Sequence, residues 1–425
     1  MKVLCLTNEF ETERFGGSGT AVTGMVRMFR ERGVAQVVVV PQTGGTTPVW
    51  DNQGENLRVL RLPRDERYFG YLGLIKEQTV LREFPELRGE WDLIHIHALN
   101  LATLAYTIAG QGIPIVYSVS SLLRVELEND PAPELQAKFA LQEELIARAQ
   151  RIHLLSRSEG HHFLNKFPEL AARAEVIPLG CRLPSAEWQY NRSQTLLYVG
   201  RLVKYKGVED LLRALCLLKI QGRQFTLDLV GKGTEDYERH LRTLANLGQR
   251  VRFHGWEGNP ERVTEWMRKA SILVVPSHRE SFGLVALEGM ALGIPIVAST
   301  AGGLGELVSP TCALTFPAGD VNALARALAT AVDNPQLMRT LGRNARHKAT
   351  TLEWSKLADR YLGLYHRAAY TATVTVTSSV PINREGLEVK GGVDDELVHD
   401  GFLQERSLFQ SDNGHKTSLD LERDA

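Results

Sequence analysis

The chain has 425 residues, of which 43% are hydrophobic and 23% are charged, and its net charge is −1. This length and composition predict an ordinary globular protein of two or three domains. The near-zero net charge excludes binding to nucleic acid or to an anionic membrane through bulk charge.

Cysteine usage and the N-terminus concern the compartment. The four cysteines are scattered without a CxxC spacing, which argues against a disulfide framework or a zinc site and fits a reducing compartment. The first residues, MKVLCLTNEFETE, hold too short an apolar run for a signal peptide. No apolar run approaches the ~18 residues of a membrane span. We therefore expect a cytoplasmic protein without a transmembrane segment.

The first half alternates strands with helices. A short apolar strand at 3–7 is followed by a glycine-bearing loop, a helix at 21–33 and a continuous β-branched strand at 34–41. Such a continuous run is typical of a strand buried on both faces. Further segments are a helix at 132–150 and strands at 92–97, 114–120, 151–156 and 175–180. The alternation predicts a parallel sheet with crossover helices.

A second series of elements begins near Gln194. Its strands are expected at 195–200, 225–231, 251–255, 271–277 and 295–300. Its helices are expected at 207–221, 235–247, 260–270, 282–292 and 321–332. The polar, turn-rich segment 180–193 separates the two series. We therefore predict two α/β domains joined there.

The periodic pattern stops after a last helix at 352–369. Residues 371–425 contain 11 Asp and Glu against 5 Lys and Arg, a net charge of −6. We expect a mostly disordered acidic tail, although TVTVTSSV at 373–380 could instead pair as a strand. The acidic run at 394–396 is interpreted as solvated charge rather than a metal site.

Arg201 and Lys206 stand five positions apart in GRLVKYKG at 200–207, after the first strand of the second series. The carboxyl end of a parallel strand is where α/β proteins place ligands. Arg201 can bind two phosphate oxygens at once and Lys206 adds a mobile charge, so the pair suits a diphosphate. A solvated loop with ordinary surface charges is the alternative.

Two glutamates flank a predicted helix start in HRESFGLVALEGMALGIP at 278–295. Ser281 is a good N-cap residue, and Gly293 with Pro295 gives the stop signal after Leu292. The free N–H groups around Phe282, Gly283 and Leu284 then form a site for an anion or a hydroxyl.

If the helix covers most of their interval, Glu280 and Glu288 lie about 12 Å apart along its axis. That separation is too large for one metal ion or for an acid–base pair of carboxylates. Carboxylates accept hydrogen bonds and would bind diols at the two ends of an extended ligand such as a nucleotide sugar. The alternative is one surface glutamate and one capping glutamate.

These segments together resemble a known family. PSHRESFGLVALEGMALGIPIVASTAGGLGELV resembles the glutamate-x7-glutamate motif of the retaining GT-B glycosyltransferases of family 4. The resemblance continues in order through LTNEFETERFGGSGTAV, WDLIHIHALN, EVIPLG, YVGRLVKYKG, LVGKGTE and LEWSKLADRYLGLY. It implies two Rossmann-like domains with parallel sheets facing a central cleft. The N-terminal acceptor-side domain would span 1–185 plus a crossover helix at 352–370, and the nucleotide-sugar-binding domain 190–350.

The resemblance also implies roles for individual residues. Glu280 would bind the transferred sugar and Glu288 the ribose, while Arg201 and Lys206 would hold the diphosphate. The backbone from Ser281 through Phe282 and Gly283 to Leu284 would meet sugar and phosphate. Gly16 and Gly17 would close over the diphosphate, and the segment from Phe253 to Gly255, which contains His254, would contact the base through backbone atoms. His97 would face the reacting centre, whereas we expect His95 to lie on the opposite strand face and to be packed.

This sequence departs from the family at one position, and it lacks one motif common in other transferases. Ser120 stands where many relatives carry a histidine, which puts an imidazole on the acceptor side in doubt. No aspartate-x-aspartate motif occurs in residues 1–370, so we expect no metal and no cofactor. Arg201 and Lys206 would instead stabilise the negative charge on the departing diphosphate.

Other classes fit less well. GGSGTA could suggest a dinucleotide-binding dehydrogenase, but its glycines lie about eight residues beyond the first strand and GSGTAV lacks the last glycine. A periplasmic-type binding protein would need an export signal. A non-catalytic nucleotide-sugar-binding regulator on the same fold stays as the alternative. We expect a hexosyltransferase of carbohydrate biosynthesis, with UDP-sugars as the first donor candidates and a small molecule, glycan or lipid-linked sugar as hydroxyl acceptor. With a lipid-linked acceptor the protein would be peripheral to the membrane.

Overall fold

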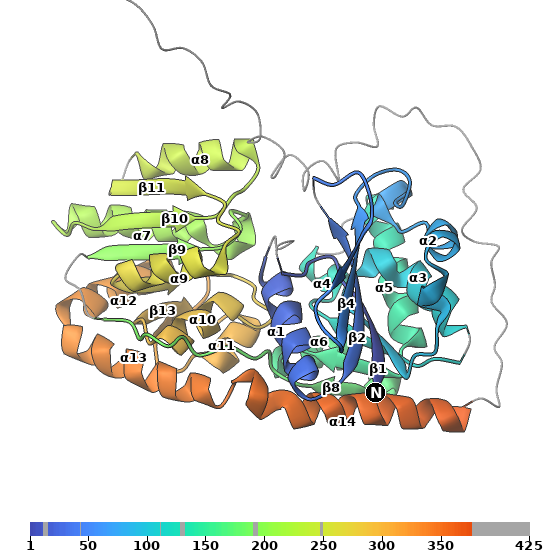
Figure 1. Cartoon of the computed structure of the whole chain (residues 1–425). Helices are drawn as coiled ribbons and strands as arrows, with labels where there is room; N and C mark the ends of the chain where they lie inside the picture. The colour runs from blue at the N-terminus through green and yellow to red at the C-terminus, as the bar shows by residue number, and fades with distance from the viewer. Residues whose placement is uncertain are drawn as a thin grey trace, which may run out of the picture.

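The computed structural model describes residues 1–11, 16–42, 44–110, 112–127, 132–189, 194–246 and 250–375. Two sheets, each with helices packed on its faces, lie side by side as separate α/β domains (Figure 1). The predicted fold class, two Rossmann-like domains with parallel sheets, is confirmed. No helix in the described part of the chain has both the length and the apolar character that a membrane crossing requires.

The N-terminal domain is built on an eight-stranded sheet in the order β3-β4-β2-β1-β5-β6-β7-β8. Its strands are β1 Lys2–Leu6, β2 Ala35–Gln42, β3 Val49–Asn52, β4 Leu57–Pro63, β5 Leu93–Ile96, β6 Ile115–Val119, β7 Arg151–Leu154 and β8 Ala174–Val176. Its helices are α1 Gly17–Glu31, α2 Glu77–Glu83, α3 Ala102–Ala109, α4 Leu123–Glu126, α5 Pro133–Arg148 and α6 Arg157–Lys166. Short 3-10 turns lie at η1 Tyr71–Gly73, η2 Pro85–Arg88, η3 Leu99–Leu101 and η4 Pro168–Arg173.

The C-terminal domain is built on a six-stranded parallel sheet in the order β11-β10-β9-β12-β13-β14. Its strands are β9 Thr195–Val199, β10 Thr226–Val230, β11 Arg250–Gly255, β12 Ile272–Val275, β13 Ile296–Ser299 and β14 Leu314–Phe316. Its helical elements are η5 Lys204–Lys206, α7 Val208–Ile220, α8 Glu235–Ala245, α9 Pro260–Lys269, α10 Leu284–Leu292, α11 Gly302–Leu307, α12 Val321–Asp333 and α13 Pro335–Thr350.

The β-branched run at 34–41 forms β2, which is buried on both faces as its composition predicts. Val37 and Val39 belong to the apolar cluster on one face of the sheet. Val38 and Val40 belong to a different cluster, together with Val22 of α1. The strand is therefore placed by the burial of both of its faces, without the alternation that a half-exposed strand shows.

The edge of the N-terminal sheet was not predicted from the sequence. Strands β3 and β4 pair antiparallel, and they add a hairpin to an otherwise parallel sheet. β3 is only four residues long and none of its residues is fully buried, so it gives little apolar pattern. An antiparallel edge strand on a parallel sheet is common among doubly wound folds.

The last helix of the described residues, α14 Trp354–Thr375, returns the chain to the N-terminal domain. It follows α13 along the lower edge of both domains and lies under the N-terminal sheet (Figure 1). Its Tyr361 and Tyr365 are fully buried, and Tyr365 stacks on Phe29 of α1 with ring centroids 4.4 Å apart. Trp354 lies so close to Gly24 and Gly180 that a Cβ on either glycine would clash with its ring. These contacts make α14 part of the N-terminal core.

Truncation after Tyr370 is expected to leave the fold and donor binding intact. Among residues 354–370 of α14, the last buried side chain is that of Ala368, and Tyr370 is 76% exposed. The tail was expected to begin at 371 without regular structure, or with a strand at 373–380, but α14 continues as a helix through Thr375. Residues 376–425 lie outside the described part of the chain. Circular dichroism during heating and protection by a UDP-sugar would test this. A cooperative loss of helix signal in the truncated protein would show that the tail belongs to the core.

Candidate functional site

A cavity of about 2150 Å³ lies between the two domains. This exceeds the range of about 300–1,000 Å³ that is usual for a pocket holding one small ligand, so it has room for two substrates. Ser120 lines it, at the end of β6. The cavity also brings together eleven of the predicted site residues: Gly16, Gly17, His97, Arg201, Lys206, Glu280, Ser281, Phe282, Gly283, Leu284 and Glu288.

His254 is the predicted site residue that does not line this cavity. Its Nε2 lies 2.7 Å from Oδ1 of Asp228, and its ring packs against Trp266 with centroids 4.2 Å apart. Arg252 binds the same carboxylate. The His254 side chain therefore pairs with a neighbouring strand and is not directed at a ligand. Trp256, two residues further on, does line the cavity.

Lys206 and Glu280 form an ion pair at the centre of the C-terminal side of the cavity. Lys206 Nζ lies 2.7 Å from Glu280 Oε2, and the Ser277 hydroxyl donates to the same oxygen at 3.2 Å. Both charged side chains are less than one-fifth exposed. The proximity comes from the loops after β9 and β12, which are neighbouring parallel strands of the sheet. The cation and the carboxylate thus meet at the carboxyl edge of the sheet, where α/β folds place ligands.

Tyr205 was not singled out from the sequence, and it organises the cations on either side of it. Its hydroxyl accepts a hydrogen bond from Arg201 Nη2 and donates to Glu126 of the N-terminal domain at 3.3 Å. Lys206 Nζ lies 5.5 Å from the centre of its ring. Gly207 ends the loop with φ +70, and a Cβ there would lie 2.0 Å from the carbonyl oxygen of Pro276. Only glycine allows the loop to approach β12 this closely.

The start of α10 differs from the prediction. The helix begins at Leu284 and its N-cap is Gly283, with φ +98, whereas Ser281 had been expected as the cap. The left-handed conformation of Gly283 turns the chain sharply, so Glu280 lies in an irregular loop and the separation of about 12 Å along one helix axis does not apply. The predicted end is confirmed, because Gly293 caps the helix with φ +84. The N–H groups of Leu284, Val285 and Ala286 belong to the first turn, and Leu284 and Val285 line the cavity.

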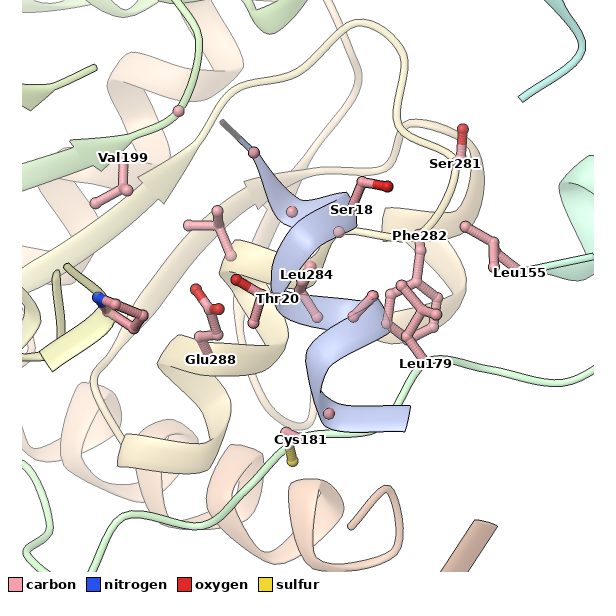
Figure 2. A pocket seen from close by; sticks show the side chains of 18 of the residues that line it. Ser18, Thr20, Leu155, Leu179, Cys181, Val199, Ser281, Phe282, Leu284 and Glu288 are labelled. Atoms are coloured by element: carbon pink, nitrogen blue, oxygen red, sulfur yellow. The ribbon is translucent and has the colours of Figure 1, made fainter. Parts of the chain in front are cut away.

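Glu288 projects from the second turn of α10 toward α1 of the other domain. Figure 2 shows the side chains of Glu288 and Thr20 next to each other on facing helices. Both side chains line the cavity. A Cβ on Gly17 would lie 3.4 Å from Leu284, so the N-terminus of α1 packs directly over the start of α10.

Glu9 is a second residue that the sequence analysis missed. Its carboxylate accepts hydrogen bonds from the N–H groups of Gly16 and Gly19, each at 3.0 Å. It therefore satisfies the N-terminus of α1, where an acidic side chain is favoured by the free donors and the helix dipole. The predicted contact of Gly16 with a diphosphate would need its N–H, which Glu9 occupies here. The signal in the sequence was the glutamate ahead of a glycine-rich loop.

His97 and His95 lie on the same side of β5, contrary to the expectation for His95. Their ring centroids are 4.0 Å apart. Side chains alternate along a strand with a period of two, so residues two apart share a face. His95 is buried, as expected. Burial, with a smaller contribution from His153, lowers the pKa of His97 to about 3, so its imidazole is neutral.

Glu159 of α6 adds a carboxyl group on the N-terminal side of the cavity. Burial raises its pKa to about 7, against a hydrogen bond from Ser281 that lowers it. The neighbouring N–H groups of Arg157 and Ser158 donate to Glu306 of the other domain, at 3.0 and 2.6 Å. No sequence motif pointed to these residues, because the contacts join segments about 150 residues apart.

Among the described residues, no group of three or more His, Cys, Asp or Glu side chains is arranged to hold a metal ion. The expectation of metal-free chemistry stays a prediction.

Two families of known proteins match this chain. Residues 16–180 match the "Glycosyl transferase 4-like domain" family, and residues 186–348 match the "Glycosyl transferases group 1" family. The boundary between the two matches falls between the two sheets.

Individual proteins are similar over most of the chain. The D-inositol 3-phosphate glycosyltransferase of Kribbella flavida is 29% identical over 317 residues, which cover 67% of this chain and 73% of that protein. The sucrose-phosphate synthase of Thermosynechococcus elongatus has a TM-score of 0.72 at 24% identity, covering 87% of this chain and 99% of that one. The Anabaena protein HepE, solved in complex with UDP-glucose, has a TM-score of 0.66 at 20% identity, covering 88% and 100%.

Proposed function

Because this chain is a GT-B glycosyltransferase, we propose that it transfers a hexose from a nucleoside-diphosphate sugar to a hydroxyl acceptor with retention of configuration. Its N-terminal domain matches the glycosyl transferase 4-like family, and its C-terminal domain matches the glycosyl transferases group 1 family. The hexose and the retention rest on the resemblance of the segment from Glu280 to Glu288 to the glutamate-x7-glutamate motif.

One observation carries this proposal: the Lys206–Glu280 pair lies beside the first turn of α10, in the cavity between the domains. A donor that inserts there separates the pair. Its diphosphate takes the ammonium of Lys206, the guanidinium of Arg201 and the N–H groups at the start of α10. Its sugar hydroxyls donate to the carboxylate of Glu280. Glu288, one turn further along α10, binds the ribose.

These cations and N–H groups are in place before the bond to the sugar breaks. Negative charge then grows on the departing diphosphate, and donors already directed at it lower the barrier without reorganisation. The neutral His97 opposite them binds a hydroxyl of the sugar or of the acceptor without adding charge. The reaction assigned to these residues uses no metal.

The donor base and sugar are to be identified by a thermal-shift screen of UDP-, GDP- and ADP-sugars. A ligand that binds only the folded state raises the melting temperature. UDP-glucose is the first candidate, supported by the fold shared with the UDP-glucose complex of HepE. Assays of free-sugar release in water, and of product formation with an acceptor, then distinguish sugar transfer from binding alone.

The two domains are expected to close further when the donor binds. Gly17 belongs to one domain and Arg201 and Lys206 to the other, and all three line the cavity that would hold the diphosphate. The ligand binds the closed state better and shifts the population toward it. Small-angle X-ray scattering should show a smaller radius of gyration with UDP-glucose than without. Curves that overlay with the site saturated would contradict closure.

A further inference from the structure

A buried chain of hydrogen bonds runs beneath His97, from α14 across three strands. Tyr365 Oη lies 2.7 Å from His95 Nδ1, and His95 Nε2 lies 2.8 Å from Ser118 Oγ. Ser118 Oγ lies 2.8 Å from His153 Nδ1, and His153 Nε2 lies 2.8 Å from the carbonyl oxygen of Ile177. All four side chains are less than 5% exposed.

The carbonyl at one end fixes the direction of every bond in this chain. A carbonyl only accepts, so His153 carries its proton on Nε2, and its Nδ1 accepts from the Ser118 hydroxyl. Ser118 then has only lone pairs for His95, so His95 carries its proton on Nε2. His95 Nδ1 therefore accepts from the Tyr365 hydroxyl.

This chain of hydrogen bonds requires the imidazoles of His95 and His153 to be neutral, and their buried surroundings keep them neutral. Burial lowers the pKa of His153 to about 4. Burial, with His97 and His153 as smaller causes, lowers the pKa of His95 well below its usual value. Within the described residues, His97 Nε2 is buried without a hydrogen-bond partner. His97 Nε2 is therefore available to a substrate hydroxyl. Both nitrogens of His95 and both nitrogens of His153 are already occupied by the hydrogen bonds described above.

We propose that Tyr365 is a positioning residue for His97: its hydroxyl fixes the tautomer and orientation of His95, and His97 packs against His95 on the cavity side. The inference rests on the proposed contact of His97 with a substrate. It assigns a role in the reaction to the C-terminal helix α14, which lies behind the sheet. A displacement of about 1 Å in a catalytic group can cost up to about 100-fold in rate.

Steady-state kinetics of Tyr365→Phe, His97→Ala and the double variant test this role, with the most active nucleotide sugar from the thermal-shift panel. Tyr365→Phe removes one buried hydrogen bond and should lower kcat about 2- to 12-fold, with little change in the donor KM. In the His97→Ala background the same substitution should have no further effect, because the residue through which it acts is absent.

Tyr68→Phe is the matched control. Tyr68 is equally buried in the same domain, and its hydroxyl donates to Glu83 at 2.8 Å, away from the cavity. It should keep the wild-type kcat. The inference would be overturned if Tyr365→Phe kept the wild-type kcat. It would also be overturned if the loss of kcat in the double variant equalled the product of the losses in the two single variants. An unchanged kcat in His97→Ala would overturn it together with the contact proposed for His97, but would leave sugar transfer itself standing.

The tautomers are read independently of activity from 15N spectra of histidine-labelled protein. His95 and His153 should both carry the proton on Nε2, and Tyr365→Phe should alter the signal of His95 while Tyr68→Phe should not. The opposite tautomer at His95, or a His95 signal unaffected by Tyr365→Phe, would overturn the inference even if kcat falls. If wild-type protein turns over no nucleotide sugar, the proposed function fails, and these spectra still decide whether Tyr365 fixes His95.

Discussion

Lys206→Ala is expected to lower kcat about 100- to 1000-fold, the largest effect we expect from a single substitution. The ammonium group would neutralise charge that develops on the diphosphate only as the bond to the sugar breaks. Loss of one such preorganised donor raises a barrier by about 2.7–4 kcal/mol. Ground-state binding should fall much less, because Arg201 and the first turn of α10 still hold the diphosphate.

Lys204 provides the control for this substitution. It lies in the same short turn, η5, but it is exposed and does not line the cavity. Lys204→Ala should therefore keep the wild-type kcat, and both variants should melt within a few degrees of wild type. A kcat for Lys206→Ala within tenfold of wild type, measured at saturating donor, would remove Lys206 from the reaction.

The two glutamates of α10 and its preceding loop should separate turnover from affinity. Glu280→Gln should lower kcat strongly and leave binding of free nucleoside diphosphate nearly unchanged, because Glu280 would contact the transferred sugar alone. Glu288→Ala should weaken the free diphosphate and the sugar donor alike, because both contain the ribose. Loss of a hydrogen bond to a charged group costs about 1.5–3 kcal/mol, or about 10- to 150-fold in affinity.

Calorimetric titration of UDP and UDP-glucose into both variants, beside their turnover, checks this assignment. In this structure Glu280 is the partner of Lys206, so Glu280→Gln also frees the ammonium, and a modest gain in affinity for the bare diphosphate fits the proposal. Weaker UDP binding in Glu280→Gln combined with wild-type binding in Glu288→Ala would reverse the two roles. Wild-type behaviour of both would reduce these carboxylates to ordinary helix-end residues.

The parts of the fold that could be predicted are those with a strong local pattern. A continuous β-branched run predicts β2, and a helical period predicts α14. Gly293 marks the end of α10. The β3–β4 hairpin escaped because a short, half-exposed edge strand has little apolar pattern to recognise. The start of α10 was misplaced because Ser281 is a good cap by type, whereas the left-handed backbone of Gly283 decides where the helix begins.

The site could be predicted in its C-terminal half and only partly in its N-terminal half. Arg201, Lys206 and Glu280 come from two loops at the carboxyl ends of neighbouring strands, and parallel-sheet geometry brings such loops together. Tyr205 and Glu159 act through partners 79 and 122 positions away, Glu126 and Ser281 respectively, and such pairings have no local signal. They depend on how the two domains meet, which a single sequence does not encode in any short pattern.

The return of α14 to the N-terminal domain has a consequence during synthesis. β5, β6 and β7 leave the ribosome first, but Tyr361 and Tyr365, which cover them, are made only after the whole C-terminal domain. The interval from Leu154, at the end of β7, to Tyr361 is about 200 residues, or on the order of 10–40 s at about 5–20 residues per second. During that time the polar atoms of His95 and His153 are not covered by α14, and the nascent N-terminal half cannot complete its core on its own. The two halves are thus separate as folded domains, but the N-terminal one is complete only when α14, the last helix in the described part of the chain, has been made.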